Sequence, residues 1–242
     1  MKRALLLVFS LCIAVGLAAQ VTFGPKLGFN LSKYAYNYSS DFKHIEPQSK
    51  FRLGFAVGGM MNLDILEFLA FQPSLMIAKK GSGIDVADEY SGNAVITGYK
   101  RTRVTYLEVP LNLALKLKVG AFKFQIFAGP YIAYALAGKA KWDYEKNDDG
   151  IRTDHKGEEK ISLKNEIPAD AGEKTLYYQS PLDIGMNFGF GYQVNHVLIN
   201  LGFAMGFSNL QPDKEGVDSY SSDFKYSNRT IFLSAAWLFG GE

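Results

Sequence analysis

The sequence predicts an all-β protein: an eight-stranded antiparallel up-and-down transmembrane β-barrel. Eight stretches, each of about ten residues, alternate large apolar side chains with small or polar ones, as strands of such barrels do. Short and long connections alternate between them, and the N-terminus has the composition of an export signal. Because side chains alternate faces along a strand, each stretch has one continuous apolar face, which fits lipid on one side.

The N-terminus predicts a signal peptide over residues 1–19, which leaves residues 20–242 as the barrel domain. Met1-Lys2-Arg3 is basic, residues 4–15 are apolar, and Gly16-Leu17-Ala18-Ala19 supplies small residues for cleavage. The apolar run is shorter than the ~20 residues that a spanning helix needs. Cleavage would also remove Cys12, the only cysteine, so we expect neither a disulfide nor a thiolate metal site in the mature chain.

The charge of the mature chain is balanced. Removing Lys2 and Arg3 from the 26 basic residues leaves 24, equal to the 24 acidic residues. A neutral chain gives no reason to expect nucleic acid as a partner. An exported apolar chain without a spanning helix can still enter a membrane by closing a barrel, which leaves no unpaired sheet edge in lipid.

The strands follow from the alternation. In Leu182–Gln193 every second residue is large and apolar, and the residues between are Asp, Gly, Asn and Gln. Read in this way, the chain predicts strands at about 21–31, 52–63, 67–79, 104–118, 121–138, 178–194, 197–208 and 228–239.

The connections predict the topology. Short turns fall at 64–66, 119–120 and 195–196, and long polar segments fall at 32–51, 80–103, 139–177 and 209–227. Outer-membrane barrels have short periplasmic turns, long extracellular loops and an even strand number. We therefore expect both termini in the periplasm. Ten strands are the alternative, if 139–177 holds an extra hairpin.

The main rival is a soluble eight-stranded barrel that encloses a ligand, because its strands alternate too. Its non-apolar face would have to be a solvated surface. Here that face is rich in Gly and Ala, as in Gly24, Gly28, Gly202, Ala204 and Gly206, which suits a narrow filled interior better. The composition therefore favours the membrane barrel.

Three segments carry a family resemblance. Residues 23–30 (Phe-Gly-Pro-Lys-Leu-Gly-Phe-Asn), 106–111 (Tyr-Leu-Glu-Val-Pro-Leu) and 128–131 (Ala-Gly-Pro-Tyr) resemble the first, fourth and fifth strands of the small outer-membrane β-barrel proteins of gram-negative bacteria. These are often labelled porin family and include OmpA/OmpX-like barrels. The resemblance covers the mature chain and implies a cell outer membrane location. It brings no catalytic residue.

Charges on the interior face predict an ionic cluster. Counted from the periplasmic ends, Arg52, Glu108 and Asp183 reach similar height, and Lys26 shares the interior face. Unpaired charges in a narrow lumen are costly, so we expect these side chains to pair. The cluster is either a structural plug or a gate for permeation.

No constellation predicts a catalytic, cofactor or metal site. Asp143, Glu145, Asn147, Asp149 and Gly150 approach the spacing of a calcium loop, but the bidentate twelfth ligand would be Lys156. Some small outer-membrane barrels modify lipids with a histidine beside a serine, and His44 with Ser39, Ser40 or Ser49 could be drawn that way. Nothing in the spacing requires it.

The function expected from the sequence is a surface-exposed barrel, without an efficient open pore, that stabilises the envelope or recognises a partner. Eight strands enclose an interior just wide enough for side chains. Loop aromatics suit recognition of an extracellular protein or glycan, although they could equally cover one another. The lipid partners would be outer-membrane lipid and lipopolysaccharide, and the chain would be a monomer. The alternatives are a small porin or channel and an outer-leaflet lipid-modifying enzyme. The loop aromatics are Tyr34, Tyr36, Tyr38, Phe42, Trp142, Tyr144, Tyr220 and Phe224.

Overall fold

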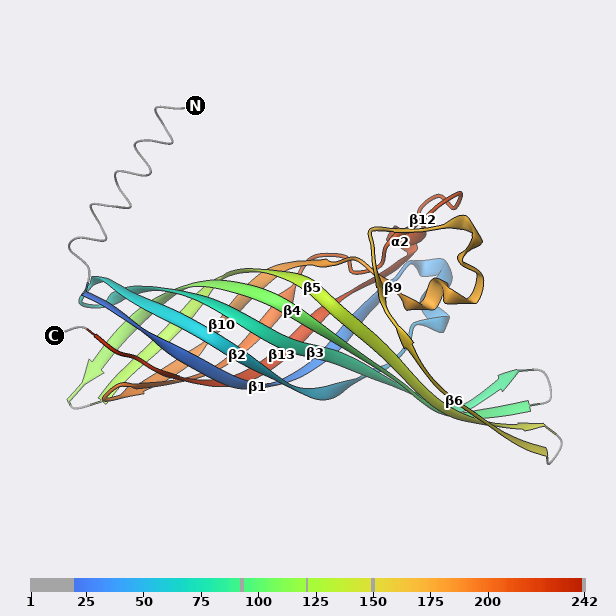
Figure 1. The fold of residues 1–242 in the computed structure, drawn as a ribbon, viewed down its shortest axis with the longest axis horizontal. Helices are drawn as coiled ribbons and strands as arrows, with labels where there is room; N and C mark the ends of the chain where they lie inside the picture. Colours follow the sequence, from blue (N-terminus) through green and yellow to red (C-terminus); the bar gives the residue numbers. More distant parts are fainter. Residues whose placement is uncertain (1–19, 92–93, 121, 149–150, 241–242) are drawn as a thin grey trace, which may run out of the picture.

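Eight long strands close into an antiparallel ring in the computed structural model (Figure 1), in the order β10–β11–β13–β1–β2–β3–β4–β5, with β5 pairing back to β10. The structure describes residues 20–91, 94–120, 122–148 and 151–240, so the predicted signal peptide lies outside the described residues. The eight-stranded prediction is confirmed. The ring strands are β1 (Gln20–Tyr38), β2 (Ser49–Leu66), β3 (Leu69–Ser91), β4 (Ala94–Val119), β5 (Phe122–Asp148), β10 (Leu182–Val194), β11 (Val197–Gly206) and β13 (Phe224–Trp237).

The two faces of each strand divide as the alternation predicts. On β1, Phe29 is 66% exposed on the outer wall, whereas its neighbour Asn30 is 5% exposed inside the barrel. On β10, Leu182 and Ile184 are exposed and Asp183 is fully buried. An apolar outer wall around a polar interior is the arrangement of a barrel in lipid and the reverse of a soluble ligand-binding barrel.

Short connections lie at one end of the barrel, here called the turn end, and long ones at the other, the loop end. Asn195, with φ of 50°, sits in the tight turn between β10 and β11, a conformation that asparagine tolerates. The turn predicted at 64–66 lies slightly later, because β2 continues to Leu66 and β3 begins at Leu69. At the turn end the first and last strands meet: the Phe23 and Phe239 amides each donate to the other residue's carbonyl, at 3.0 and 2.8 Å.

Much of two predicted loops is strand. β3, β4 and β5 continue past the loop end, and β6 (Ile151–Lys160) pairs with β5 there. Residues 84–91, 94–103, 139–148 and 151–160 thus form a four-stranded extension, the protruding sheet (Figure 1). The segment 139–177 does contain an extra hairpin strand, but β6 stays outside the ring, so the barrel does not have ten strands.

Residues 161–181 and 207–223 form a cap over the loop end (Figure 1). Leu210 joins it to the barrel: its amide donates to Tyr226 O, and its carbonyl accepts from the Ser180 amide, both at 2.9 Å. Ile167 and Leu210 of the cap are fully buried. The remaining elements are η1 (Ser40–Ile45), β7 (Ser162–Leu163), β8 (Glu166–Ile167), η2 (Ala169–Tyr177), β9 (Tyr178–Gln179), β12 (Asp213–Lys214) and α2 (Tyr220–Asp223).

None of the helices in the described ranges is long and apolar enough to cross a membrane.

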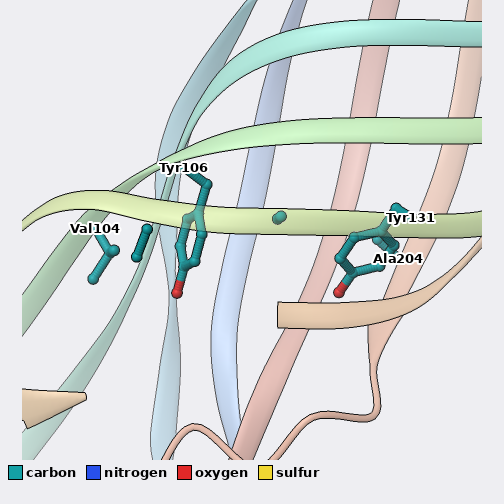
Figure 2. Close-up of a cluster of buried hydrophobic side chains, with 6 residues drawn as sticks. Val104, Tyr106, Tyr131 and Ala204 are labelled. Carbon is teal, nitrogen blue, oxygen red and sulfur yellow. The ribbon is translucent and has the colours of Figure 1, made fainter. Parts of the chain in front are cut away.

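The main buried apolar cluster lies inside the barrel near the loop end. Figure 2 shows Val104 and Tyr106 from β4, Tyr131 from β5 and Ala204 from β11. Ile161 and Leu163 of the cap pack against this cluster. The tyrosines place large rings in the lumen while their hydroxyl groups remain available for hydrogen bonds.

Candidate functional site

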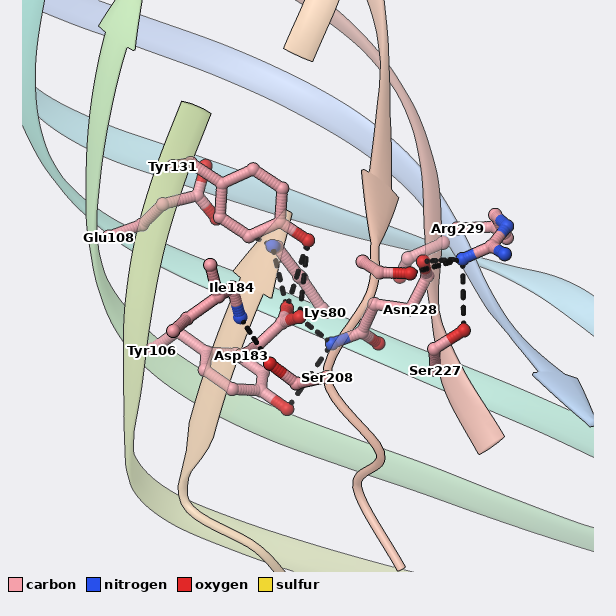
Figure 3. A network of polar contacts seen from close by, with 12 residues as sticks. Lys80, Tyr106, Glu108, Tyr131, Asp183, Ile184, Ser208, Ser227, Asn228 and Arg229 are labelled. Atoms are coloured by element: carbon pink, nitrogen blue, oxygen red, sulfur yellow. Dashed lines mark hydrogen bonds and ion pairs between the residues drawn. The ribbon is translucent and has the colours of Figure 1, made fainter. Parts of the chain in front are cut away.

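A buried ion-pair network occupies the loop half of the lumen. Lys80 of β3 extends its ammonium between carboxylates of two other strands: Nζ lies 2.6 Å from Glu108 Oε2 and 3.5 Å from Asp183 Oδ2. The Lys80 side chain is 3% exposed and that of Asp183 is 0% exposed. Figure 3 shows the lysine reaching across the barrel interior toward both acids. Such charges are retained at low dielectric only when they are paired and hydrogen-bonded.

Hydrogen bonds complete the surroundings of Asp183. Tyr131 Oη lies 3.2 Å from both carboxylate oxygens, and Asn228 Nδ2 donates to Oδ2 at 2.8 Å (Figure 3). Lys80 Nζ also lies 4.6 Å from the centre of the Tyr131 ring and 5.4 Å from that of Tyr106, within the range of cation–π attraction. With Asp183 itself on β10 and with Glu108 and Tyr106 on β4, the network therefore joins side chains from five strands.

The cap is bonded to this network. Gln179 Nε2 donates to Tyr106 Oη at 2.6 Å, and Tyr34 Oη donates to Gln179 Oε1 at 2.8 Å. Gln179 is 2% exposed and follows η2 in the cap. The chain Tyr34–Gln179–Tyr106 thus fixes the cap to the walls on either side of the loop end.

The four interior charges predicted from the sequence occupy different places. Glu108 and Asp183 both lie against Lys80. Lys26 is buried and lines a cavity that Glu108 also lines. Arg52 lies nearer the mouth, where its charged neighbours are Arg101, Arg103 and Asp85. It is offset because the β2–β3 register shifts between Phe51 and Ala56.

Sequence reasoning missed Lys80, because the apolar alternation of β3 fades near residue 79 and Lys80 was assigned to a loop. The available signal was the interior series Met76, Ala78, Lys80 and Ser82, which continues the two-residue period.

A second polar network fills the turn half of the lumen. Gln72 Nε2 donates to Asn62 Oδ1 and to Gln125 Oε1, both at 2.9 Å, and Gln125 Nε2 donates to Asn200 Oδ1 at 2.9 Å. All four side chains are at most 4% exposed. Lys116 forms an ion pair with Asp64 at the turn-end mouth. The amides therefore form a second barrier in series with the first.

Between the two networks lies a small cavity of about 60 Å³. Three of the lining side chains, Asn30, Asn112 and Asn187, have buried Oδ1 atoms without a hydrogen-bond partner among the described residues. A polar cavity of this size has room for a few water molecules, each needing ~10–15 Å³, which would satisfy these groups. Lys80 and Glu108 of the ion-pair network form part of the lining of this cavity.

The protruding sheet is strongly charged and internally paired. Glu158 of β6 bonds Lys139 at 2.6 Å and Lys141 at 2.5 Å, and these two ammonium groups lower the pKa of Glu158 to about 2. Lys156 bonds Asp143 at 2.9 Å, which raises the pKa of Lys156. Residues 143–148, which approach calcium-loop spacing in the sequence, belong to strand β5. Asp143, the first acid of that spacing, is bonded to Lys156. β6 pairs with β5 along one side, and no described strand pairs along its other side.

The loop-end aromatics mainly cover one another. Tyr34 and Tyr226 have ring centres 4.9 Å apart, and Phe224 lies 4.7 Å from Phe42 and 5.2 Å from Tyr38. Tyr34, Tyr36 and Tyr38 occupy the same face of β1 as the interior residues Asn30 and Ser32. They therefore line the mouth of the barrel instead of standing free for recognition.

Among the described residues, none of Ser39, Ser40 and Ser49 forms a hydrogen bond with His44. It lies in η1 and is exposed, and the Ser49 hydroxyl donates to Tyr34 O. Within the described ranges, no three His, Cys, Asp or Glu side chains are grouped to hold a metal ion.

Comparison with known proteins agrees with this architecture. Residues 18–211 match the family model described as outer membrane protein beta-barrel domain. No curated protein matches the chain.

Among solved structures, the chain is similar to Ail, the attachment invasion locus protein of Yersinia pestis. The match has 11% identity, a TM-score of 0.37, and coverage of 91% of this chain and 99% of Ail. Ail in complex with the heparin analogue sucrose octasulfate gives the same identity and coverages with a TM-score of 0.39. Neisserial surface protein A matches at 10% identity and a TM-score of 0.33, with coverage of 90% of this chain and 97% of that one.

Proposed function

Because the chain belongs to the family of outer membrane proteins with a β-barrel domain, we propose that it is a closed barrel that displays its protruding sheet outside the cell for contact with an extracellular partner. The loop end then faces outward and the turn end faces the periplasm, as in other bacterial barrels. The observation that supports the proposal is a four-stranded sheet that extends past the loop end of a barrel whose lumen is filled with side chains.

The filled lumen argues against an efficient pore. The ion-pair network and the amide network are in series, and the cavity between them is about 60 Å³. A solute or hydrated ion would have to break buried hydrogen bonds from several strands at both barriers. Each buried group left unsatisfied costs about 1–3 kcal/mol, and charged groups cost more.

The protruding sheet offers two features for recognition. The outer side of β6 leaves backbone donors and acceptors open to an extended segment of another protein, as in recognition by strand addition. Its side chains alternate in charge, from Arg152 and Asp154 to Lys156 and Glu158, so the edge carries both signs. These features favour a protein partner with an exposed strand over a glycan. A monomer of the barrel would be sufficient for such binding.

A binding experiment tests the proposal. Bacteria that display the wild-type chain should adhere to immobilised extracellular proteins, and cells in which Asn-Gly replaces residues 143–156 should not. This change shortens the β5–β6 hairpin symmetrically, because Asp143 pairs with Lys156. Lys123→Gln, at the turn end, is the matched surface control and should adhere like the wild type. Equal adhesion by the shortened and wild-type chains would refute recognition through this sheet.

Two further assays separate the alternatives. Purified barrel in planar bilayers should give no stable conductance, and large reproducible steps would favour a channel. We assign no catalytic role to His44, so outer-membrane lipid composition should be the same with wild-type protein and with His44→Ala. A lipid change that depends on His44 would favour an enzyme.

A further inference from the structure

The outer wall of the barrel carries an apolar groove. The groove runs over β1, β2 and β3 and has a volume of about 900 Å³. Pro25, Gly59 and Pro73 form its floor in adjoining strands, and Pro25 pairs directly with Gly59. Phe23, Val57, Met61, Leu75, Ile77 and Leu107 are among the side chains that line it.

Local sequence explains the depression. Gly59 has no side chain, and a Cβ added there would meet only Gly24 O, at 3.5 Å, so the space above it is open. Pro25 and Pro73 have compact rings and no backbone N–H, and neither can extend a long side chain over the groove. A lipid-facing wall would otherwise carry large apolar residues at such positions.

A cation stands directly above the groove. Lys79 is the next outward-facing residue on β3 after Ile77, which lines the upper end of the groove. Its Nζ lies 4.7 Å from the centre of the Phe55 ring, and no carboxylate pairs with it among the described residues. Ten residues of tilted strand separate Leu69 from Lys79, which is ~25 Å of height, the thickness of the apolar band. Lys79 therefore lies at the boundary with the lipid headgroups.

More unpaired positive charge lies just beyond Lys79. Arg103 lies opposite Gly81 and Arg101 opposite Gly83, on the same outer face of β4. Across the β4–β5 pair, Arg103 faces Lys139, which is itself bonded to Glu158. Glu158 neutralises Lys139 and Lys141, but neither arginine has a carboxylate partner among the described residues. The headgroup level above the groove is thus short of negative charge.

We propose that this groove and Lys79 form a binding site for lipopolysaccharide of the outer leaflet, with one acyl chain in the groove and a lipid phosphate at Lys79 and Arg103. An apolar groove with an unpaired cation at its upper end matches a molecule with an acyl chain attached to a phosphorylated headgroup. Neither feature alone selects it: an uncharged lipid would leave Lys79 unpaired, and a free phosphate would leave the groove empty. Stacking on Phe55 keeps the ammonium at this position.

Native mass spectrometry of barrel purified from outer membranes in mild detergent tests the site. Wild type should retain one lipopolysaccharide molecule, identified by its mass. Gly59→Leu, which fills the groove, and Lys79→Gln, which removes the cation, should each reduce the bound fraction at least fivefold. Ala137→Leu is the control for added bulk on the outer wall. Lys33→Gln is the control for the cation, because Lys33 is also stacked on a ring, that of Phe51, but away from the groove. Both controls should retain the lipid.

Three outcomes would overturn the proposal: wild type without bound lipid, a bound glycerophospholipid in place of lipopolysaccharide, or equal retention by all four variants. Each variant is first checked for the mobility shift on heating that a folded barrel shows, and a variant without it is replaced by Gly59→Val or Lys79→Met.

Discussion

Lys80 Nζ lies 2.6 Å from Glu108 Oε2 and 3.5 Å from Asp183 Oδ2, so one ammonium holds together carboxylates from two strands that are not neighbours. Because β3 and β10 lie apart in the ring, this contact braces the barrel across its lumen. Taking one partner away from such a group costs more than replacing the whole group with apolar residues. This asymmetry leads to two predictions.

Lys80→Met should lower the free energy of unfolding by about 3–5 kcal/mol, because both acids would lose their buried partner. Urea unfolding in detergent, followed by the heat-dependent mobility shift, measures the change. The triple variant Lys80→Met/Glu108→Gln/Asp183→Asn should recover much of the loss. A triple variant no more stable than the single one would show that size, not charge, dominates at Lys80.

Glu108→Gln should cost on the order of 3 kcal/mol. Lys80 would then keep only Asp183, at 3.5 Å, and would still be buried. The same unfolding assay applies, with Glu67→Gln at the turn end as the surface control. If Glu108→Gln unfolds at the wild-type urea concentration, Glu108 must have access to water.

The two lumen networks should act as independent barriers. Gln72→Ala/Gln125→Ala removes the two glutamines that link the turn-half amides but leaves the loop half closed, so no conductance should appear in planar bilayers. Adding Tyr106→Ala/Tyr131→Ala should produce stable current steps, because the two large rings that fill the lumen around the Lys80 ion pairs are then missing as well. Conductance in the first double variant alone would show that the ion-pair network does not obstruct the lumen.

Glu158 should titrate with a midpoint of about 2, because Lys139 and Lys141 favour its charged form. Its folded pKa is below the unfolded value of about 4.3, so its stabilisation of the hairpin is complete above that pH and is lost as the pH falls through about 2. NMR titration of the labelled carboxyl carbon measures the midpoint. Lys139→Met should raise it, and Lys43→Met, at a distant loop, should not.

Gly157→Val should disrupt the β5–β6 hairpin. A Cβ at Gly157 would lie 2.3 Å from the Trp142 ring, so the indole would have to leave its place between Gly157 and Tyr177. Limited proteolysis of the folded barrel should then cut within residues 139–160 faster than in the wild type. Thr153→Val, also on β6, is the control for a valine in this strand. Gly216→Val would not serve, because φ at Gly216 is +75° and valine would be strained there. Similar cleavage rates for Gly157→Val and wild type would argue against this packing.

The alternation of side chains was sufficient to predict the ring, because lipid imposes one rule on every spanning strand. The same rule explains why the strand ends were misplaced. Beyond the membrane both faces of a strand meet water, so β3, β4 and β5 continue through segments such as 97–103 without an apolar period.

The interior network could be predicted only in part. Glu108 and Asp183 fall on strands with clear alternation. Both lie directly opposite Ala133 of β5, Glu108 from one side and Asp183 from the other. Lys80 falls where the alternation fades. Arg52 could not be placed because a shift in register after Phe51 is invisible in the sequence. Asn228 of β13, which donates to Asp183, and Gln179 of the cap, which donates to Tyr106, reach the network through long-range packing that no local pattern records.

The hydrogen bonds between Phe23 and Phe239 join the two ends of nearly the whole described chain. Every other strand pair in the ring closes a shorter loop, and closing a loop of this length costs ~5 kcal/mol of chain entropy. The seam between β1 and β13 must therefore be the last to seal during assembly, after the hairpins have formed. Until then both edge strands expose unpaired backbone, so insertion into lipid and closure of the seam have to proceed together.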